Sequence, residues 1–416
     1  MNKVLLSEVA NVELSSIDKK IKPDEKSVKL CNFTDVYYNW AITKDNLELC
    51  MNGSVKNSEY QKLSLKKGQV AITKDSETRD DIGMPCYISD DFENAVLGYH
   101  CALITPNSDK LNGKYLNALL NTTYARKCFA NNAGGSGQRF TLSKEAIENI
   151  KIPLPALDVQ KKIGSFFSDI DKKIQNNNKQ IQTLESLAKT IYDYWFVQFD
   201  FPNEDGKPYK SSGGKMVWNE ELKREIPEGW KVDNLISISE FINGLACQNY
   251  RPTKNEKGIN VVKIKEMRDG VTENTELVSE NIPSKYLVDN GDLLFSWSAS
   301  LLVDYWYHGV GGLNQHIFKV VPKEGISKEY VFHQLSDYIL KFIKIAESRK
   351  TTMGHITSDH LKQSIIYVAP RALIDSYSQK SQPIRSMIQK LSLENDHLSS
   401  LKKFILPLLM NGQVHV

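Results

Sequence analysis

The sequence has 416 residues, of which 41% are hydrophobic and 25% charged, a composition that excludes a disordered or fibrous chain and predicts at least two globular domains. Its 53 Lys and Arg only slightly outnumber its 50 Asp and Glu, so we expect any basic surface for nucleic acid to be local. No apolar run approaches a membrane span, no signal segment opens the chain, and the six cysteines are scattered without a C-x-x-C pair. We therefore expect a cytoplasmic protein with free thiols and no membrane contact.

The first domain is placed at residues 1–156 and is followed by a long helix at residues 157–198. Apolar residues of this helix recur in alternating steps of four and three, which is typical of a coiled-coil seam. The expected seam positions are Ile163, Phe167, Ile170, Ile174, Asn177, Ile181, Leu184, Ala188, Ile191 and Trp195. Asn177 is the one polar break, and a buried Asn in such a seam fixes the register of the two helices.

A Gly- and Pro-rich connector at residues 199–229 leads to a second domain at residues 230–370 and a second helix at residues 371–416. Its expected seam positions are Ile384, Met387, Leu391, Glu394, Leu398, Leu401, Ile405 and Leu408. Antiparallel pairing from end to end places Asn177 beside residues 392–394, so the two polar breaks meet. The pattern also fits two amphipathic helices that each lie on their own domain.

An internal repeat relates the two domains. Residues 95–120 align with residues 309–335, and residues 139–155 align with residues 355–370 after one small gap. The alignment matches His100 with His316, Pro106 with Pro322, and Tyr115 with Tyr330. Both copies have the pattern of a strand, a Pro turn, a helix, a polar loop, a short helix and a strand. A repeat of this length indicates a duplicated domain.

Three stretches carry a resemblance: IKIPLPALDVQKKIGSFF at residues 150–167, FDFPNEDGKPYKSSGGKMV at residues 199–217, and IPEGWKVDNL at residues 226–235. On these residues the chain resembles the specificity subunits of type I restriction-modification systems, over essentially its whole length. The resemblance implies an α+β fold, with two mixed α/β target recognition domains separated by a long antiparallel two-helix coiled coil and related by a pseudo-two-fold internal repeat. The first copy departs from the family pattern because it lacks a PEGW lead-in, and the second has YVAP rather than IPLP.

The resemblance also implies a non-catalytic subunit that reads double-stranded DNA. Each target recognition domain is expected to read one half of a bipartite, asymmetric site, while the helices act as spacer and docking surface. The expected partners are two N6-adenine methyltransferase subunits, with restriction subunits joining through that complex. S-adenosylmethionine, ATP and magnesium then belong to the partner subunits, and no cofactor belongs to this chain.

Motifs for catalysis are absent from the sequence. There is no G-x-x-x-x-G-K-[ST], because the nearest string at residues 211–216 lacks the spacing and the hydroxyl, and there is no G-x-G-x-x-G, H-E-x-x-H or Asn-Pro-Pro. His308 and His316 lack the further ligands that a zinc site needs. We therefore predict no catalytic and no metal residues, and expect His100 and His316 to pack or hydrogen-bond at equivalent strands.

Candidate DNA contacts lie on loops rich in Gly, Ser and Thr, where phosphates can approach closely. They are Lys74, Arg79, Arg126, Lys127, Gln138 and Arg139 in the first copy, and Trp297, Lys341, Lys344, Arg349 and Lys350 in the second. The loops after the central strands differ, as base reading requires: KDSETRDD at residues 74–81 and SWSAS at residues 296–300. Arg79 suits guanine and Gln138 suits adenine. Trp297 could be an apolar wedge that contacts DNA, or a residue of the core. The basic residues could instead lie on a solvated surface.

Two other functions stay open at this point. A self-contained methyltransferase or nuclease would modify DNA without a partner, and the missing motifs argue against it. An orphan or mobile-element specificity subunit would borrow or block a host methyltransferase, and the sequence does not separate this function from that of an ordinary specificity subunit.

Overall fold

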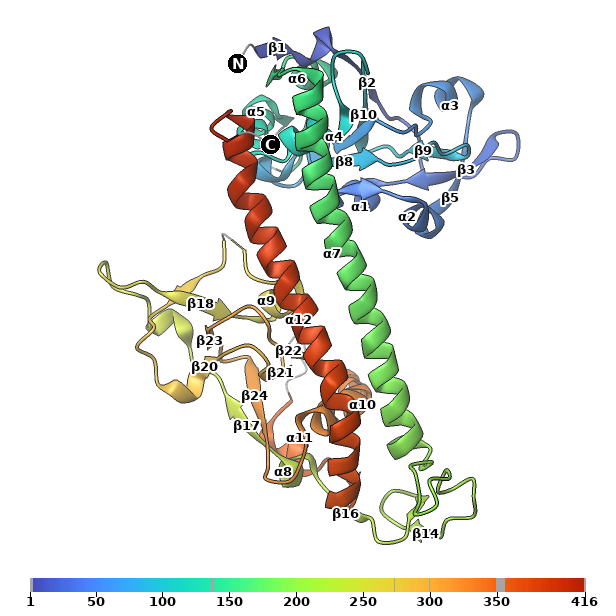
Figure 1. The fold of residues 1–416 in the computed structure, drawn as a ribbon, viewed down its shortest axis with the longest axis vertical. Coiled ribbons are helices and arrows are strands. Elements are labelled where there is room, and N and C mark those ends of the chain that lie inside the picture. The colour runs from blue at the N-terminus through green and yellow to red at the C-terminus, as the bar shows by residue number, and fades with distance from the viewer. Residues whose placement is uncertain (1–2, 136–137, 273, 299, 349–355, 415–416) are drawn as a thin grey trace. The chain divides into compact units, whose positions relative to one another are not determined.

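The computed structural model describes residues 3–414 except 136–137, 273, 299 and 349–355. The chain packs as two compact units, which we call unit 1 (residues 1–175 and 397–416) and unit 2 (residues 176–396) (Figure 1). Each unit contains one copy of the repeat together with a part of both long helices. None of the described helices is long and apolar enough to cross a membrane.

Unit 1 is built on a five-stranded sheet in the order β2-β10-β6-β8-β4. Its strands are β2 (Ala10–Leu14), β4 (Ala41–Ile42), β6 (Val70–Thr73), β8 (Pro85–Ile88) and β10 (Cys101–Pro106). A second sheet, β5-β3-β9, comprises β3 (Lys26–Cys31), β5 (Met51–Val55) and β9 (Ala95–Leu97). The central strand β6 is buried over its whole length, as its continuous apolar run predicts.

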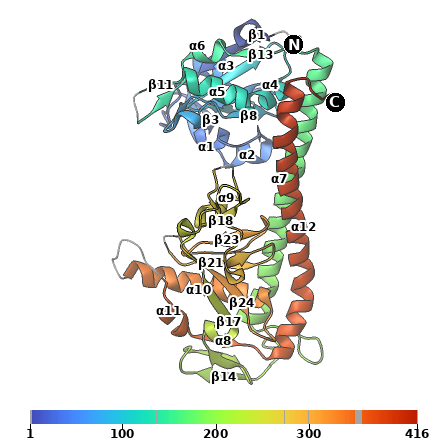
Figure 2. The same cartoon turned by 90° about the vertical axis from the view of Figure 1, so that its left-hand side faces the viewer.

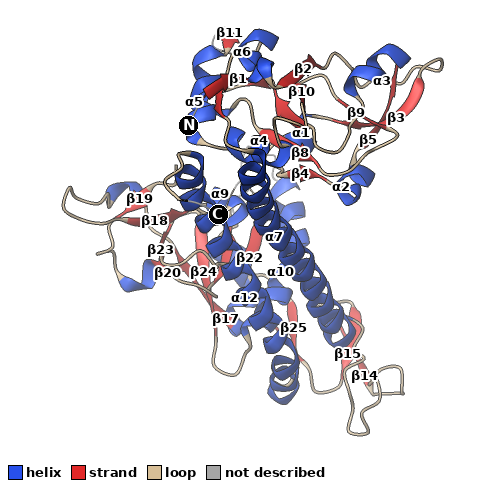
Figure 3. Ribbon diagram, turned by 45° about the horizontal axis from the view of Figure 1, so that its top comes forward, coloured by secondary structure: helices blue, strands red, loops and turns tan. Residues whose placement is uncertain are grey.

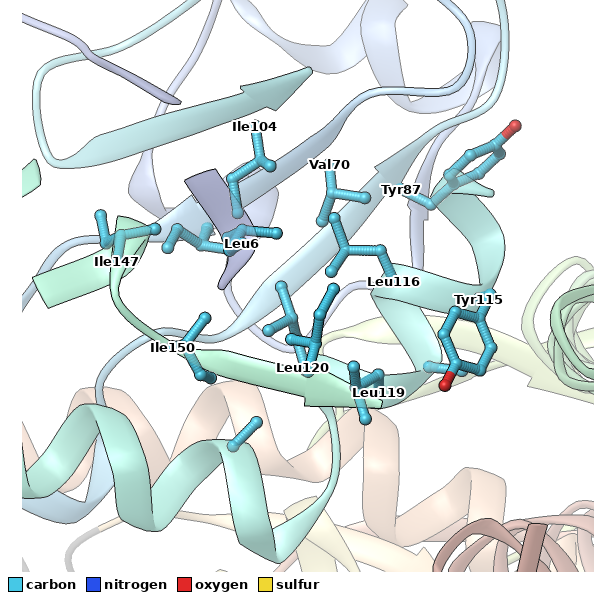
Figure 4. Close-up of a cluster of buried hydrophobic side chains, with 14 of the residues drawn as sticks. Leu6, Val70, Tyr87, Ile104, Tyr115, Leu116, Leu119, Leu120, Ile147 and Ile150 are labelled. Atoms are coloured by element: carbon cyan, nitrogen blue, oxygen red, sulfur yellow. The ribbon is translucent and has the colours of Figure 1, made fainter. Parts of the chain in front are cut away.

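The main core of unit 1 lies between the five-stranded sheet and α4 (Gly113–Leu120). Asn112 caps this helix, because its side-chain oxygen accepts a hydrogen bond from the Tyr115 N–H at 3.1 Å. Leu116 and Leu120 of α4 lie close to Val70 of the central strand (Figure 4). The other helices are α1 (Phe33–Val36), α2 (Lys44–Leu49), α3 (Asn57–Leu63), α5 (Thr123–Asn132) and α6 (Lys144–Glu148). Short strands complete the unit: β1 (Lys3–Leu5) with β13 (Lys151–Pro153), and β7 (Asp75–Ser76) with β12 (Phe140–Thr141) and β11 (Gly134–Gly135).

Unit 2 has a four-stranded sheet in the order β17-β24-β21-β22 and a second sheet in the order β19-β18-β23-β20 (Figure 3). The first comprises β17 (Ser239–Asn243), β21 (Leu293–Ser296), β22 (Leu302–Tyr305) and β24 (Ile317–Pro322). The second comprises β18 (Ile259–Val262), β19 (Leu277–Val278), β20 (Leu287–Val288) and β23 (Gly311–Leu313). The helices are α8 (Leu235–Ile238), α9 (Ile264–Asp269), α10 (Lys328–Ser348) and α11 (Ser358–Lys362). The two-stranded pairs are β16 (Lys231–Asp233) with β25 (Ile366–Val368), and β14 (Met216–Asn219) with β15 (Arg224–Pro227) in the connector.

The internal repeat is confirmed strand by strand. β10 pairs antiparallel with β2 and β6, as β24 does with β17 and β21, and each second sheet contains one parallel pair, β3 with β9 or β18 with β23. The aligned tyrosines make the same contact. The Tyr115 hydroxyl donates to the carbonyl of Pro153 at 2.8 Å, and the Tyr330 hydroxyl donates to that of Tyr367 at 3.2 Å. The copies differ at α10, a single helix of 21 residues where unit 1 has α4 and α5.

Both long helices of the prediction are confirmed. α7 (Leu157–Tyr192) has 36 residues and continues as a π-helical turn at Asp193–Val197, and α12 (Arg371–Met410) has 40 residues (Figure 2). Within unit 2, Asn177 lies against Glu394, whereas Trp195 lies against Tyr377 with their ring centroids 6.0 Å apart. Residue numbers therefore rise along α7 while they fall along the facing part of α12, so the two helices pair antiparallel. The start of α7 also packs into the core of unit 1, so the alternative of a helix lying on its own domain holds for that part.

The predicted seam of α12 is confirmed at Ile384, Leu391, Leu398 and Ile405, and the predicted meeting of Asn177 with Glu394 is confirmed, but the intervening positions Met387 and Leu401 are wrong. Met387 and Leu401 are 46% and 40% exposed, although both were expected to face α7. Their neighbours differ, since Ile388 is buried and Lys402 is half-buried. The inward positions are Ile384, Ile388, Leu391, Asn395, Leu398, Lys402, Ile405 and Leu409. This set also alternates in steps of four and three, but it includes Asn395 and Lys402.

The reason for the error is that α12 has adjacent apolar residues at Met387–Ile388 and at Leu408–Leu409, so hydrophobic periodicity alone does not decide which of each pair faces α7. The set of positions with fewer polar residues was the natural prediction. In the structure the two polar residues have partners: Asn395 accepts a hydrogen bond from Asn177 at 2.9 Å, and Lys402 Nζ lies 3.7 Å from the ring centroid of Trp40. Burial lowers the pKa of Lys402 to about 8. Specific partners therefore offset the cost of turning these groups inward.

Candidate nucleic-acid interface

Asp75 gathers three basic side chains in unit 1. It begins β7 two positions after the end of β6, and it is buried. Its Oδ2 lies 2.7 Å from His100 Nδ1, 3.4 Å from Lys74 Nζ and 3.5 Å from Arg139 Nη2, while the Thr141 hydroxyl donates to its Oδ1. Burial raises the pKa of Asp75, but the hydrogen bonds of Thr141 and His100 and the charges of Lys74 and Arg139 outweigh that effect, so the pKa lies below its ordinary value. The ionised carboxylate therefore attracts all three basic groups to one place.

Aromatic rings lie beside these basic groups. The Tyr99 ring centroid is 4.6 Å from Lys74 Nζ and 4.7 Å from the centroid of His100. The guanidinium carbon of Arg79 is 5.0 Å from the Phe140 ring centroid. A cavity of about 240 Å³ adjoins Tyr99 and His100, and its other lining residues are Asp18, Lys19, Asn32, Phe33 and Thr34. Basic groups interleaved with aromatic rings suit contact with phosphates and base edges.

The remaining candidates of unit 1 surround the same loop. Arg126 on α5 is half-buried, with its guanidinium carbon 6.0 Å from the ring centroid of Tyr38. The Tyr38 hydroxyl donates to Asp81 Oδ1 at 2.8 Å, which ties α1 to the loop that carries Arg79. Lys127 and Gln138 are exposed. The structure therefore brings Lys74, Arg79 and Arg139 together, and leaves Lys127 and Gln138 on the surface without a described side-chain contact that would orient them.

In unit 2 the candidates lie on α10 and at the end of β21. Lys341 and Lys344 are exposed on α10, and Lys341 Nζ lies 4.6 Å from the ring centroid of Tyr338. Trp297 is half-buried at the edge of the core, and its Nε1–H donates to Asn243 Oδ1 at 3.0 Å. Its ring thus has both a packed side and an accessible part. Arg349 and Lys350 lie outside the described residues.

The expected role of His100 at a strand is confirmed by its contact with Asp75. The aligned His316 holds the residue after β21 through its backbone, because its carbonyl accepts a hydrogen bond from the Trp297 N–H at 3.2 Å. Sequence reasoning missed Asp75 and Asn243. Asp75 could have been suspected, because a carboxylate directly follows Lys74, but its contact with Arg139 depends on the pairing of β7 with β12.

Among the described residues, no group of three or more His, Cys, Asp or Glu side chains is arranged to hold a metal ion. The free cysteines include one close pair, with Cys31 Sγ 3.4 Å from Cys50 Sγ in the core of the β5-β3-β9 sheet.

Two copies of one mixed α/β domain, each followed by a long helix and each with a different side-chain set after its central strand, define a duplicated recognition protein. The family model for the type I restriction modification DNA specificity domain matches residues 1–186 and 227–372, and the chain belongs to this family. It therefore has the DNA-recognition role of a specificity subunit, a role that is not catalytic.

Individual relatives agree with this family. The chain is 22% identical over 428 aligned positions to the type I restriction enzyme HindI specificity subunit of Haemophilus influenzae, covering 88% of this chain and 91% of that protein. It is 24% identical to the type I restriction enzyme MjaIX specificity subunit of Methanocaldococcus jannaschii, covering 74% and 70% of the two chains. The crystal structure of the type I restriction-modification S subunit from M. genitalium has the same fold, with a TM-score of 0.56 at 13% identity over 98% of this chain and 95% of that chain.

Proposed function

We propose that the chain reads a bipartite, asymmetric site on double-stranded DNA, with one repeat for each half. The observation that carries this proposal is the difference between equivalent positions of the two units. Unit 1 has a cluster of Lys74, Arg139 and His100 held by Asp75, and unit 2 has Trp297 held by Asn243. Two unlike surfaces on one duplicated scaffold suit two unlike half-sites.

The chain also positions partner subunits in this proposal. Two N6-adenine methyltransferase subunits bind it, and restriction subunits join through that complex. The complex acts in the cytoplasm, where cysteine thiols stay reduced. S-adenosylmethionine, ATP and magnesium bind to the partners. The sequence supports this assignment because it contains no nucleotide-binding or methyltransferase motif.

The test is methylation by the reconstituted complex. The chain is co-expressed with its neighbouring methyltransferase in a host without such a system, and genomic methylation is mapped by sequencing. We expect methylated adenines in one bipartite motif, and none when either the chain or the methyltransferase is expressed alone. Methylation by the lone chain, or a complex that methylates no defined sequence, contradicts the proposal. Methylation that appears only when the chain is expressed in a second host that has its own type I methyltransferase supports the orphan subunit instead.

A further inference from the structure

Each unit builds the same hydrogen-bonded frame around the residue that follows its central strand. That residue is Lys74 after β6 and Trp297 after β21. The Lys74 N–H donates to the His100 carbonyl at 2.9 Å, and the Trp297 N–H donates to the His316 carbonyl at 3.2 Å. Their own carbonyls accept from the next segment, since Leu142 donates to Lys74 at 2.8 Å and Ile356 donates to Trp297 at 3.0 Å. All four hydrogen bonds join backbone groups.

The residue before the frame is also equivalent in the two units. Thr73 and Ser296 end their strands, and both are fully buried. The Thr73 hydroxyl oxygen accepts a hydrogen bond from the Met84 N–H at 3.0 Å, and that of Ser296 accepts from the Leu302 N–H at 2.9 Å. The point at which the chain leaves the central strand is therefore fixed by the same interactions in both copies.

The side chains on this frame differ in chemistry. Lys74 presents an ammonium group to Asp75 and to the Tyr99 ring. Trp297 presents an indole whose ring lies 5.6 Å from that of His316 and whose N–H donates to Asn243. Because the frame uses only backbone groups at this position, the frame forms with either side chain. The neighbouring side chains differ with it, since Asp75 accompanies Lys74 and Asn243 accompanies Trp297, so the position can differ between the units in what it contacts.

We propose that this position, Lys74 in unit 1 and Trp297 in unit 2, is a specificity-determining position for the DNA half-site of its unit. The inference rests on the proposed function and deepens it. The Lys74 ammonium suits the acceptor edge of guanine, and Asp75 orders it before DNA arrives. The Trp297 indole suits an apolar contact such as the thymine methyl group.

The test uses the assembled methyltransferase with Lys74→Met and Trp297→Leu, each compared with a matched control. Lys67→Met removes an exposed lysine from the loop that leads into the first residue of β6. Trp218→Leu removes an exposed tryptophan from β14. We expect Lys74→Met to lower discrimination by about 10- to 100-fold at one base pair of one half-site. Trp297→Leu is expected to act only on the other half-site, and both controls are expected to keep the motif. Lys74→Gln replaces Lys74→Met where the melting temperature shows that the latter does not fold.

Several results overturn the inference. One is an unchanged motif in both variants when the wild-type complex methylates a defined bipartite site. Another is a Lys74→Met variant whose DNA affinity falls equally on all sequences and whose salt slope is smaller by about one unit, because that result assigns Lys74 to a phosphate contact. A wild-type complex that methylates no defined site overturns the proposed function itself, so the two failures are distinguishable.

Discussion

The Asn177 contact in unit 2 makes a quantitative prediction about what holds the helices in register. Asn177 is fully buried, and its Nδ2 donates to Glu394 Oε2 and to Asn395 Oδ1, each at 2.9 Å. Asn395 in turn donates to Asn178 Oδ1 at 2.8 Å. The test variants are Asn177→Ala, Glu394→Ala and the two combined. A further variant, Asn177→Leu, replaces the amide by an apolar side chain.

The expected magnitudes follow from the two hydrogen bonds. A neutral bond contributes about 0.5–1.5 kcal/mol and a bond to a charged group about 1.5–3 kcal/mol. Glu394 is half-buried, so water weakens its bond and the lower values apply. Asn177→Ala should lower the free energy of unfolding by about 1–2 kcal/mol, because the substitution also removes the buried Oδ1 of Asn177, which has no hydrogen-bond partner among the described residues. Leucine regains about 1.5–3 kcal/mol by apolar burial, which leaves Asn177→Leu within about 1 kcal/mol of the wild type.

The assay is a double-mutant cycle on Asn177 and Glu394, measured by urea unfolding and calorimetry. We expect a coupling free energy of about 1–2 kcal/mol. Asn176, the exposed neighbour of Asn177, provides the control, and Asn176→Ala should show almost no coupling to Glu394→Ala. A coupling below about 0.3 kcal/mol for Asn177, or a stable Asn177→Ala variant, refutes the role of this contact in the seam.

Three further predictions concern catalysis, DNA affinity and pH. The purified chain alone should neither methylate nor cleave DNA in assays with S-adenosylmethionine or ATP, whereas adding the methyltransferase should yield methylation. Lys341→Ala with Lys344→Ala should weaken DNA binding by the complex and reduce its salt slope by about 2 without changing the methylated sequence, and an unchanged slope would assign both lysines to solvated surface. Burial raises the pKa of Asp171 to about 6. Because the pKa of Asp171 is higher in the folded than in the unfolded chain, its contribution to stability is full below its ordinary pKa and is lost as pH rises through about 6. Asp171→Asn should therefore reduce the fall in melting temperature between pH 4 and pH 6. Identical pH profiles of the two proteins would contradict this.

The sequence predicted the duplicated fold well, because the aligned residues are those that the fold uses. Tyr115 and Tyr330 bind equivalent backbone carbonyls, and His100 and His316 precede equivalent strands. The start of α12 was predictable from Pro370, which the helix follows directly. The helix also runs through Pro383, which lies well inside it.

The intervening seam positions of α12 and the Asp75 cluster could not be predicted, since both depend on contacts between residues distant in sequence. Lys402 faces inward because Trp40 of the first domain receives its ammonium group. Arg139 reaches Asp75 because β12 pairs with β7. Neither partner can be inferred from local spacing, and hydrophobic periodicity assigns polar residues to the surface by default.

The low similarity between the two copies has a physical explanation in the frame around the central strand. Thr73 and Ser296 each use a hydroxyl, and the residues after them are held in the frame by their backbone groups, so the frame itself does not depend on the side chains of Lys74 and Trp297. Substitution at Lys74 and Trp297 then changes what a loop contacts without moving the strand that carries it. Under the proposed function, a change of half-site can therefore arise at Lys74 and Trp297, while the aligned His, Pro and Tyr residues keep their places in the shared fold. A duplicated domain can in this way diverge in what it recognises and still keep one topology.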